Sequence, residues 1–163
     1  DSMLLATLSG RSFALAPCTA EAVIAILDHY GIEIAGERVA VVGRSNVIGR
    51  PVAALLTMRD ATVTLCHSRT VDLPSVTREA EILVVAAGRA RMIGSGYVAP
   101  GQTVIDVGIN WDETTQKLVG DVDAEAIKDI VAAYTPVPGG VGSVTTAILA
   151  KHVIEAAERT LVS

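Results

Sequence analysis

The sequence predicts a doubly wound α/β fold in which helices flank a mostly parallel sheet. Half of the 163 residues are apolar but only 3% are aromatic, so Ala, Val and Ile must fill the core. Short β-branched runs alternate with segments of helical pattern, which is typical of βαβ units. Three of these runs end at a glycine, at Gly43, Gly88 and Gly108, as strand-to-loop turns often do. A buried parallel sheet accounts for all three observations.

The expected elements follow in regular order. A first helix is predicted after Pro17, with Thr19 as its N-cap, a buried face from Val23 to Tyr30, and Gly31 as its C-cap. Strands are then expected at 38–42, 62–66, 82–86, 102–107 and 131–134. Helices are expected at 47–58, 73–80, 124–130 and about 144–161. At this length one compact domain is the natural expectation.

Composition excludes several functional classes. The net charge of −5 leaves no basic stripe for nucleic acid. No apolar run is long enough to span a bilayer, so we expect no membrane partner and a cytoplasmic location. Cys18 and Cys66 have neither a redox-motif nor a zinc spacing, which predicts reduced buried thiols and no metal site.

The first turn, VVGRSNVIGRP at Val41–Pro51, joins a predicted strand to a predicted helix. Gly43 and Gly49 supply positions where the backbone can turn tightly or approach a ligand. Free N–H groups and the helix dipole at such a turn favour an anion, as in Rossmann-like nucleotide-binding domains. The spacing lacks one glycine of the usual fingerprint. A turn without a ligand therefore stays open as an alternative for this segment alone.

The end of the second strand favours NADP over NAD. An NAD-binding unit normally carries an acid there for the ribose hydroxyls, but this strand ends in Cys-His-Ser-Arg. Arg44 from the first turn and His67, Ser68 and Arg69 from the second could converge on a 2′-phosphate, whose geometry suits arginine. His67 taken by itself would be read as a partly exposed strand-end histidine.

Two further loops fall on the same edge of the predicted sheet. The segment DVGIN at Asp106–Asn110 follows the fourth strand, and TPVPGGVGS at Thr135–Ser143 follows the fifth. The second loop is stiffened by two prolines and can present backbone N–H groups to a flat ligand. The alternative for it is a simple helix-entry loop with Ser143 as N-cap. Together the loops predict a nucleotide cleft.

These segments resemble the methylenetetrahydrofolate dehydrogenase/cyclohydrolase family, and within it the C-terminal NADP-binding domain. The resemblance covers about nine-tenths of the chain, and the linked order of its motifs is highly specific. The matching segments are PCT at Pro17–Thr19, VVGRSNVIGRP at Val41–Pro51, TVTLCHSRT at Thr62–Thr70, VIDVGIN at Val104–Asn110, VGDVD at Val119–Asp123, and TPVPGGVGSVT at Thr135–Thr145.

The resemblance implies NADP as cofactor and a set of binding residues. Family cofactor positions fall on Gly43, Arg44 and Ser45, with Arg44 and Ser68 near the 2′-phosphate, and on Thr19, His67, Ile109 and Thr145. Pro138, Gly139 and Gly140 are expected beside the substrate. The implied reaction oxidises 5,10-methylenetetrahydrofolate with NADP, and commonly also hydrolyses the methenyl product, in a homodimer.

Departures from the family pattern are equally informative. The family's catalytic lysine lies in a Tyr-x-x-x-Lys motif on an N-terminal domain. None of Lys117, Lys128 and Lys151 follows a tyrosine at that spacing, so we expect no catalytic residue here and no activity from this chain alone. Asp1 is the candidate for a folate-contacting aspartate, although residues 1–7 depart from the family pattern. Residues 20–22 (Ala-Glu-Ala) and Ser143 depart from it too.

We therefore expect residues 1–16 to be a remnant of a linker or substrate domain and residues 17–163 to form the NADP-binding domain. The alternative is a stand-alone nucleotide-binding or regulatory module that has kept the fold without the chemistry. A shikimate dehydrogenase-like NADP domain shares the architecture but fits PVPGGVG and DVGIN less well.

Overall fold

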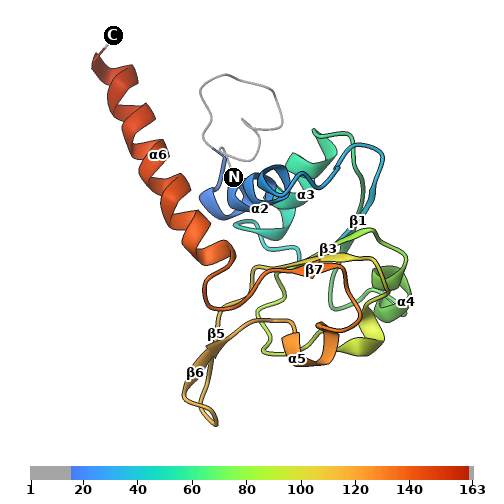
Figure 1. Ribbon diagram of the computed structural model, residues 1–163. Coiled ribbons are helices and arrows are strands. Elements are labelled where there is room, and N and C mark those ends of the chain that lie inside the picture. The colour runs from blue at the N-terminus through green and yellow to red at the C-terminus, as the bar shows by residue number, and fades with distance from the viewer. Residues whose placement is uncertain (1–15, 162–163) are drawn as a thin grey trace.

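A five-stranded sheet forms the centre of the described part of the chain (Figure 1). The computed structural model describes residues 16–161. All four strand pairings are parallel, and the strand order is β2-β1-β3-β4-β7. The strands are β1 (Arg38–Val42), β2 (Thr62–Cys66), β3 (Ile82–Val85), β4 (Thr103–Asp106) and β7 (Ala133–Tyr134). The predicted doubly wound α/β fold is confirmed.

Helices cover both faces of the sheet, and strand alternation divides the core between them. In β1, Val39 and Val41 pack on one side, while Ala40 and Val42 pack on the other. The first side is covered by α2 (Cys18–His29), α3 (Gly49–Thr57) and α6 (Val141–Leu161). The second side is covered by α4 (Leu73–Arg78), η1 (Ser95–Tyr97), α5 (Ala124–Ile127) and their loops. Every strand of the sheet centre is thus buried on both faces.

Two local predictions about the first helix, its N-cap and the extent of its buried face, are wrong, and so is the alternative that made Ser143 an N-cap. Pro17, not Thr19, precedes the first turn of α2, because the helix already begins at Cys18, and no side chain caps it. Helix α6 begins at Val141, so Ser143 lies inside its first turn and is not the N-cap. Tyr30 is 73% exposed, because α2 ends at His29 and Gly31 reverses the chain. Gly31, with φ of +64°, does end this helix as predicted.

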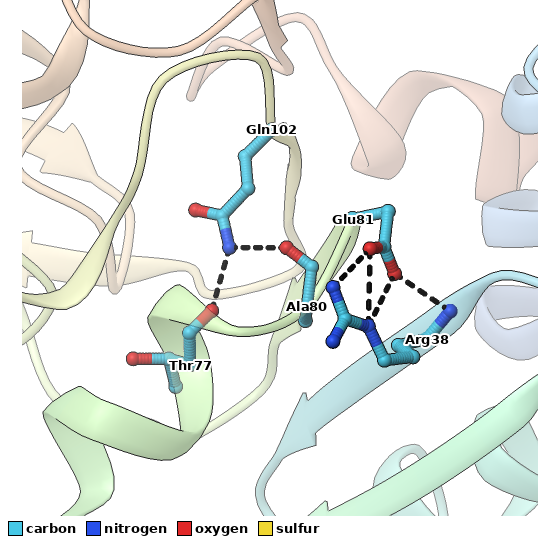
Figure 2. A network of polar contacts seen from close by, with 5 residues as sticks. All are labelled: Arg38, Thr77, Ala80, Glu81 and Gln102. Atoms are coloured by element: carbon cyan, nitrogen blue, oxygen red, sulfur yellow. Dashed lines mark hydrogen bonds and ion pairs between the residues drawn. The ribbon is translucent and has the colours of Figure 1, made fainter.

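The amino ends of the strands are tied together by the polar contacts of Figure 2. Arg38, which opens β1, donates its side-chain N–H groups to both carboxylate oxygens of Glu81, which lies just before β3. This pairing lowers the pKa of Glu81 to about 2. Gln102, just before β4, is 2% exposed and donates its side-chain amide to the carbonyls of Thr77 and Ala80, 2.6 Å from each. This edge therefore holds structural contacts, and the opposite edge is left for the loops.

A two-stranded antiparallel hairpin was not among the predicted elements. It comprises β5 (Asn110–Asp112) and β6 (Lys117–Val119) and projects from the carboxyl edge of the sheet (Figure 1). Its three-residue strands are too short to give a readable alternation in the sequence. The hairpin returns the chain to the carboxyl end of β4, where it contributes to the cleft.

Candidate nucleotide-binding site

The candidate site is a cleft at the carboxyl ends of the central strands. The chain leaves β1 for β2 on one side and returns to β3 on the other, so the switch point lies between β1 and β3. A cavity of about 570 Å³ opens there. It lies between the loops after β1, β3 and β4 and the first turns of α2 and α6. Its lining includes Thr19, Ser45, Ile48, Ala86, Ala87, Gly88, Gly108, Ile109, Asp121, Val141 and Thr145.

Two glycines allow the first turn to lie against the neighbouring loop. A Cβ on Gly43 would sit 2.1 Å from the Ala86 carbonyl oxygen, and φ at Gly43 is +120°, which side chains rarely adopt. A Cβ on Gly49 would sit 2.0 Å from the Gly43 carbonyl oxygen. Ser45 accepts hydrogen bonds from the N–H groups of Ile48 and Gly49 and so holds the turn that precedes α3. Both glycines are therefore required by backbone contacts within the turn.

Asp121 fixes the loop after β3. Its carboxylate is fully buried and accepts the N–H groups of Ala87, Gly88 and Arg89 at 2.6, 2.7 and 2.8 Å. It also accepts the side-chain amide of Asn110 at 2.9 Å. These four bonds tie the β3 loop to the hairpin, and Asp121 itself lines the cavity. The cleft wall is thus held by one side chain.

Asp106 forms the second layer of this network. Its Oδ1 accepts the N–H groups of Gly108 and Asp121, and its Oδ2 accepts that of Val122. The side chain is 4% exposed. Burial outweighs these hydrogen bonds and, with the nearby Asp121 charge, raises the pKa of Asp106 to about 6. The carboxyl orients the return of the hairpin beneath the cleft.

The ends of β1 and β2 form the neighbouring part of the edge. Val42 and Cys66 are register partners, and the Gly43 N–H donates to the Cys66 carbonyl, so the loops that follow lie side by side. Arg44, Ser68 and Arg69 are exposed there, and His67 is half-buried. The Arg69 N–H donates to His67 Nδ1 at 3.1 Å, which leaves Nε2 as the donor of a neutral ring. Donors and cations gather here without a carboxylate from the β2 end.

A smaller cavity of about 160 Å³ adjoins the cleft along Val107, Gly108 and Ile109. Its other wall is the loop before α6, including Pro138, Gly139 and Gly140. The Val137–Pro138 peptide bond is cis. The loop predicted to lie beside a flat ligand therefore does border the cleft region. Asp1 lies outside the described residues.

The predicted residues thus fall into two groups along one edge. Thr19, Ser45, Ile109 and Thr145 line the larger cavity. Arg44, His67, Ser68 and Arg69 lie beyond it, past the ends of β1 and β2. Sequence reasoning assigned no role to Asp121 or Asp106. The only available signal was a pair of acids within DVGIN and VGDVD, and nothing in the sequence shows that a hairpin brings them together.

Two general features complete the description of residues 16–161. Within this range no group of three or more His, Cys, Asp or Glu side chains is placed to hold a metal ion. No helix in the same range has the length and apolar character needed to cross a bilayer.

The sheet order, the switch-point cleft and the glycine turn define a Rossmann-like nucleotide-binding domain. Residues 17–161 match the family model described as tetrahydrofolate dehydrogenase/cyclohydrolase, NAD(P)-binding domain. The chain belongs to this family, which confirms the predicted resemblance and the nicotinamide dinucleotide class of cofactor.

Named relatives agree with the family model. The chain is 53% identical over 164 aligned positions to the bifunctional protein FolD of Carboxydothermus hydrogenoformans, covering 97% of this chain and 57% of that protein. It is 54% identical to FolD of Parafrankia sp., covering 88% of this chain and 52% of that protein. The chain thus spans about half the length of the curated relatives it matches.

Solved structures give the same result. The bifunctional enzyme FolD of Campylobacter jejuni superposes with a TM-score of 0.91 at 39% identity, covering 95% of this chain and 55% of that one. A methylenetetrahydrofolate dehydrogenase-cyclohydrolase of Trypanosoma brucei, solved with NADP cofactor and inhibitor, gives 0.88 at 39% identity, covering 99% and 59%.

Proposed function

We propose that this chain is the NADP-binding half of a bifunctional 5,10-methylenetetrahydrofolate dehydrogenase/methenyltetrahydrofolate cyclohydrolase. The observation that carries the proposal is the cleft at the β1/β3 switch point, whose lining includes four of the expected cofactor residues. The relatives called FolD are bifunctional proteins of about twice this length, which favours the enzyme half over a stand-alone module.

The residues present suit a dinucleotide. A cavity of about 570 Å³ is within the size range of ligand sites, and the bare backbone at Gly43 allows close packing of the loops around it. When bound, the nicotinamide accepts a hydride from the folate's one-carbon bridge. The chain's own part is to hold and orient that ring between Thr19 on α2, Ile109 after β4 and Thr145 on α6.

We assign the preference for NADP to the β1 and β2 ends. Arg44 and Arg69 supply cations and Ser68 a hydroxyl, on adjacent loops without an acidic residue at the β2 end. The proposal is supported by the relative from Trypanosoma brucei, whose solved complex contains NADP. A 2′-phosphate there would accept charge-assisted hydrogen bonds, while the 2′-hydroxyl of NAD would accept weaker ones.

Isothermal titration calorimetry tests this assignment. We expect the chain to bind NADP at least about tenfold more tightly than NAD, and Arg44→Ala to remove most of that ratio, because one charge-assisted bond contributes about 1.5–3 kcal/mol. The matched control is Arg59→Ala, since Arg59 pairs with Asp28 at the opposite edge and should leave both affinities unchanged. Equal affinities for the two cofactors in the unaltered chain would overturn the assignment.

The full activity needs groups from outside this chain. None of Lys117, Lys128 and Lys151 lines the cavity, and Lys151 pairs with Glu21. We therefore propose that tetrahydrofolate derivatives bind together with an N-terminal domain. From the family resemblance we also propose that the complete protein is a homodimer. The chain alone should give no NADPH absorbance with methylenetetrahydrofolate. Measurable turnover would show that a catalytic group is present here after all.

A further inference from the structure

Helices α2 and α6 pack against one another (Figure 1). Their contact brings a cysteine, a histidine and a glutamate into line. Cys18 Sγ lies 3.5 Å from His152 Nδ1. The other ring nitrogen, Nε2, lies 2.7 Å from Glu21 Oε2. His152 is 6% exposed, whereas Cys18 is half-buried. Both cysteines were predicted to be buried. The prediction is wrong for Cys18 and is confirmed for Cys66.

The hydrogen bonds of His152 determine which ring nitrogen carries the proton and which one presents a lone pair to the Cys18 thiol. Burial opposes ionisation of Glu21, but hydrogen bonds from Lys151 and His152 outweigh it and lower the pKa of Glu21. The ionised carboxylate can only accept, so His152 Nε2 carries the proton. In the neutral ring Nδ1 is then an acceptor, and it faces the Cys18 S–H. A thiol, a base and a carboxylate that orients the base are the parts of an activated nucleophile.

The position of Cys18 on its helix adds to this effect. Cys18 is the first residue of the twelve-residue helix α2, where unpaired N–H groups and the helix dipole favour a negative charge. Cys66 provides the contrast within the same chain. Cys66 is fully buried in β2, burial raises its pKa, and its S–H donates a hydrogen bond to the Thr64 carbonyl. Of the two cysteines, only Cys18 has the surroundings of a reactive thiol.

We propose that Cys18 is a modification site that takes small-molecule disulfides by thiol–disulfide exchange. His152 Nδ1 accepts the thiol proton, and the Cys18 thiolate attacks one sulfur of the disulfide. The new Sγ–S bond forms as the reagent's S–S bond breaks. The departing thiolate takes the proton back from His152 and leaves as a free thiol. Cys18 is oxidised to a mixed disulfide, and half of the reagent is reduced.

The site lies next to the nucleotide cleft but does not depend on it. Thr19 follows Cys18 directly and Thr145 lies two turns before His152 on α6, and both line the cavity. The exchange reaction requires no nucleotide. It can therefore be measured on the chain without NADP, and its outcome is separate from that of the proposed function.

The test uses glutathione disulfide with intact-mass and peptide mass spectrometry, which report Cys18 and Cys66 separately. In the native chain we expect Cys18 to react at least about tenfold faster than Cys18 in the guanidinium-unfolded chain, and Cys66 to stay unmodified. His152→Asn should lower the Cys18 rate about tenfold, since the proton acceptor is lost. Glu21→Gln should lower it about fivefold, because the oxygen that orients the ring remains but its charge does not.

The matched control is His29→Asn, because His29 is exposed at the far end of α2 and contacts only Tyr30 among the aromatic rings of the described residues. This variant should react at the unaltered rate. If His152→Asn fails to fold, as judged by circular dichroism, Glu21→Gln decides the question. A Cys18 rate within twofold of the unaltered chain in the folded variants, or no acceleration over the unfolded chain, would overturn the proposal.

Discussion

Replacing Asp121 by Asn tests how the cleft is held together. The fully buried carboxylate accepts four hydrogen bonds, three of them from consecutive N–H groups of the β3 loop. An amide keeps one accepting oxygen and turns an NH₂ group toward two of these donors. Two charge-assisted bonds at about 1.5–3 kcal/mol each are then lost. Burying a neutral group in place of a charge offsets part of this, which leaves a net loss of about 2–4 kcal/mol.

Urea unfolding followed by circular dichroism measures this loss. In thermal unfolding, a loss of about 2–4 kcal/mol for a domain of this size corresponds to a fall in Tm of roughly 4–16 °C. The exposed Asp129 gives the matched control, because Asp129→Asn should change stability by less than about 0.5 kcal/mol. Amide exchange at residues 87–89 should also accelerate. A destabilisation of Asp121→Asn below about 1 kcal/mol, with unchanged exchange there, would refute the reasoning.

Three further predictions concern other parts of the framework. Gly49→Ala should destabilise the fold by about 2 kcal/mol or more in thermal melts, because its Cβ would lie 2.0 Å from the Gly43 carbonyl oxygen. Gly96→Ala is the control and should not destabilise the fold, because Gly96 has open space around it. Asp106 should titrate near pH 6 by carbon NMR, and a midpoint below 4.5 would contradict this. Because its native pKa lies above the ordinary value of 3.8, its contribution to the free energy of unfolding falls by about 3 kcal/mol as pH rises from about 4 to 6. Gln102→Met should lower the free energy of unfolding in urea by about 2–4 kcal/mol, because three hydrogen bonds are lost. NADP affinity should not change, since these bonds lie at the amino edge of the sheet. A large fall in affinity at unchanged stability would be inconsistent with that placement.

The sheet could be predicted from the sequence because its strands carry their own signal. The bounds of β1 and β2 match the predicted runs at 38–42 and 62–66, since both are β-branched and are closed by turn residues. The other strands are one or two residues shorter than predicted at one or both ends. The predicted helix at 124–130 is only four residues long, at Ala124–Ile127. Helix α6 begins earlier than predicted because its first turn, Val-Gly-Ser, reads as loop by composition.

The candidate site divides in the same way. Residues that follow a strand directly, such as Ser45 after β1 and Ile109 after β4, could be placed at the carboxyl edge from topology alone. Thr19 and Thr145 come from helices α2 and α6, and only the family resemblance pointed to them. Asp121 could not be placed at all, because its contacts depend on how far the chain travels between Asp106 and its return.

The hairpin explains how Asp121 comes to lie beside Asp106 and why this matters for the cleft. Asp106 ends β4, and β5 and β6 carry the chain away and back, so that Asp121 receives the loop after β3 while its own N–H donates to Asp106. Gly108 and Gly120 must both lack side chains, since a Cβ on either would overlap one of these carboxylates. The two aspartates and two glycines therefore form one interlocked unit. Because that unit joins the loops after β3 and β4, the hairpin supports the wall of the candidate cleft, although its own strands do not line the cavity. Lengthening or shortening the hairpin should therefore change the width of the cleft before it changes the sheet.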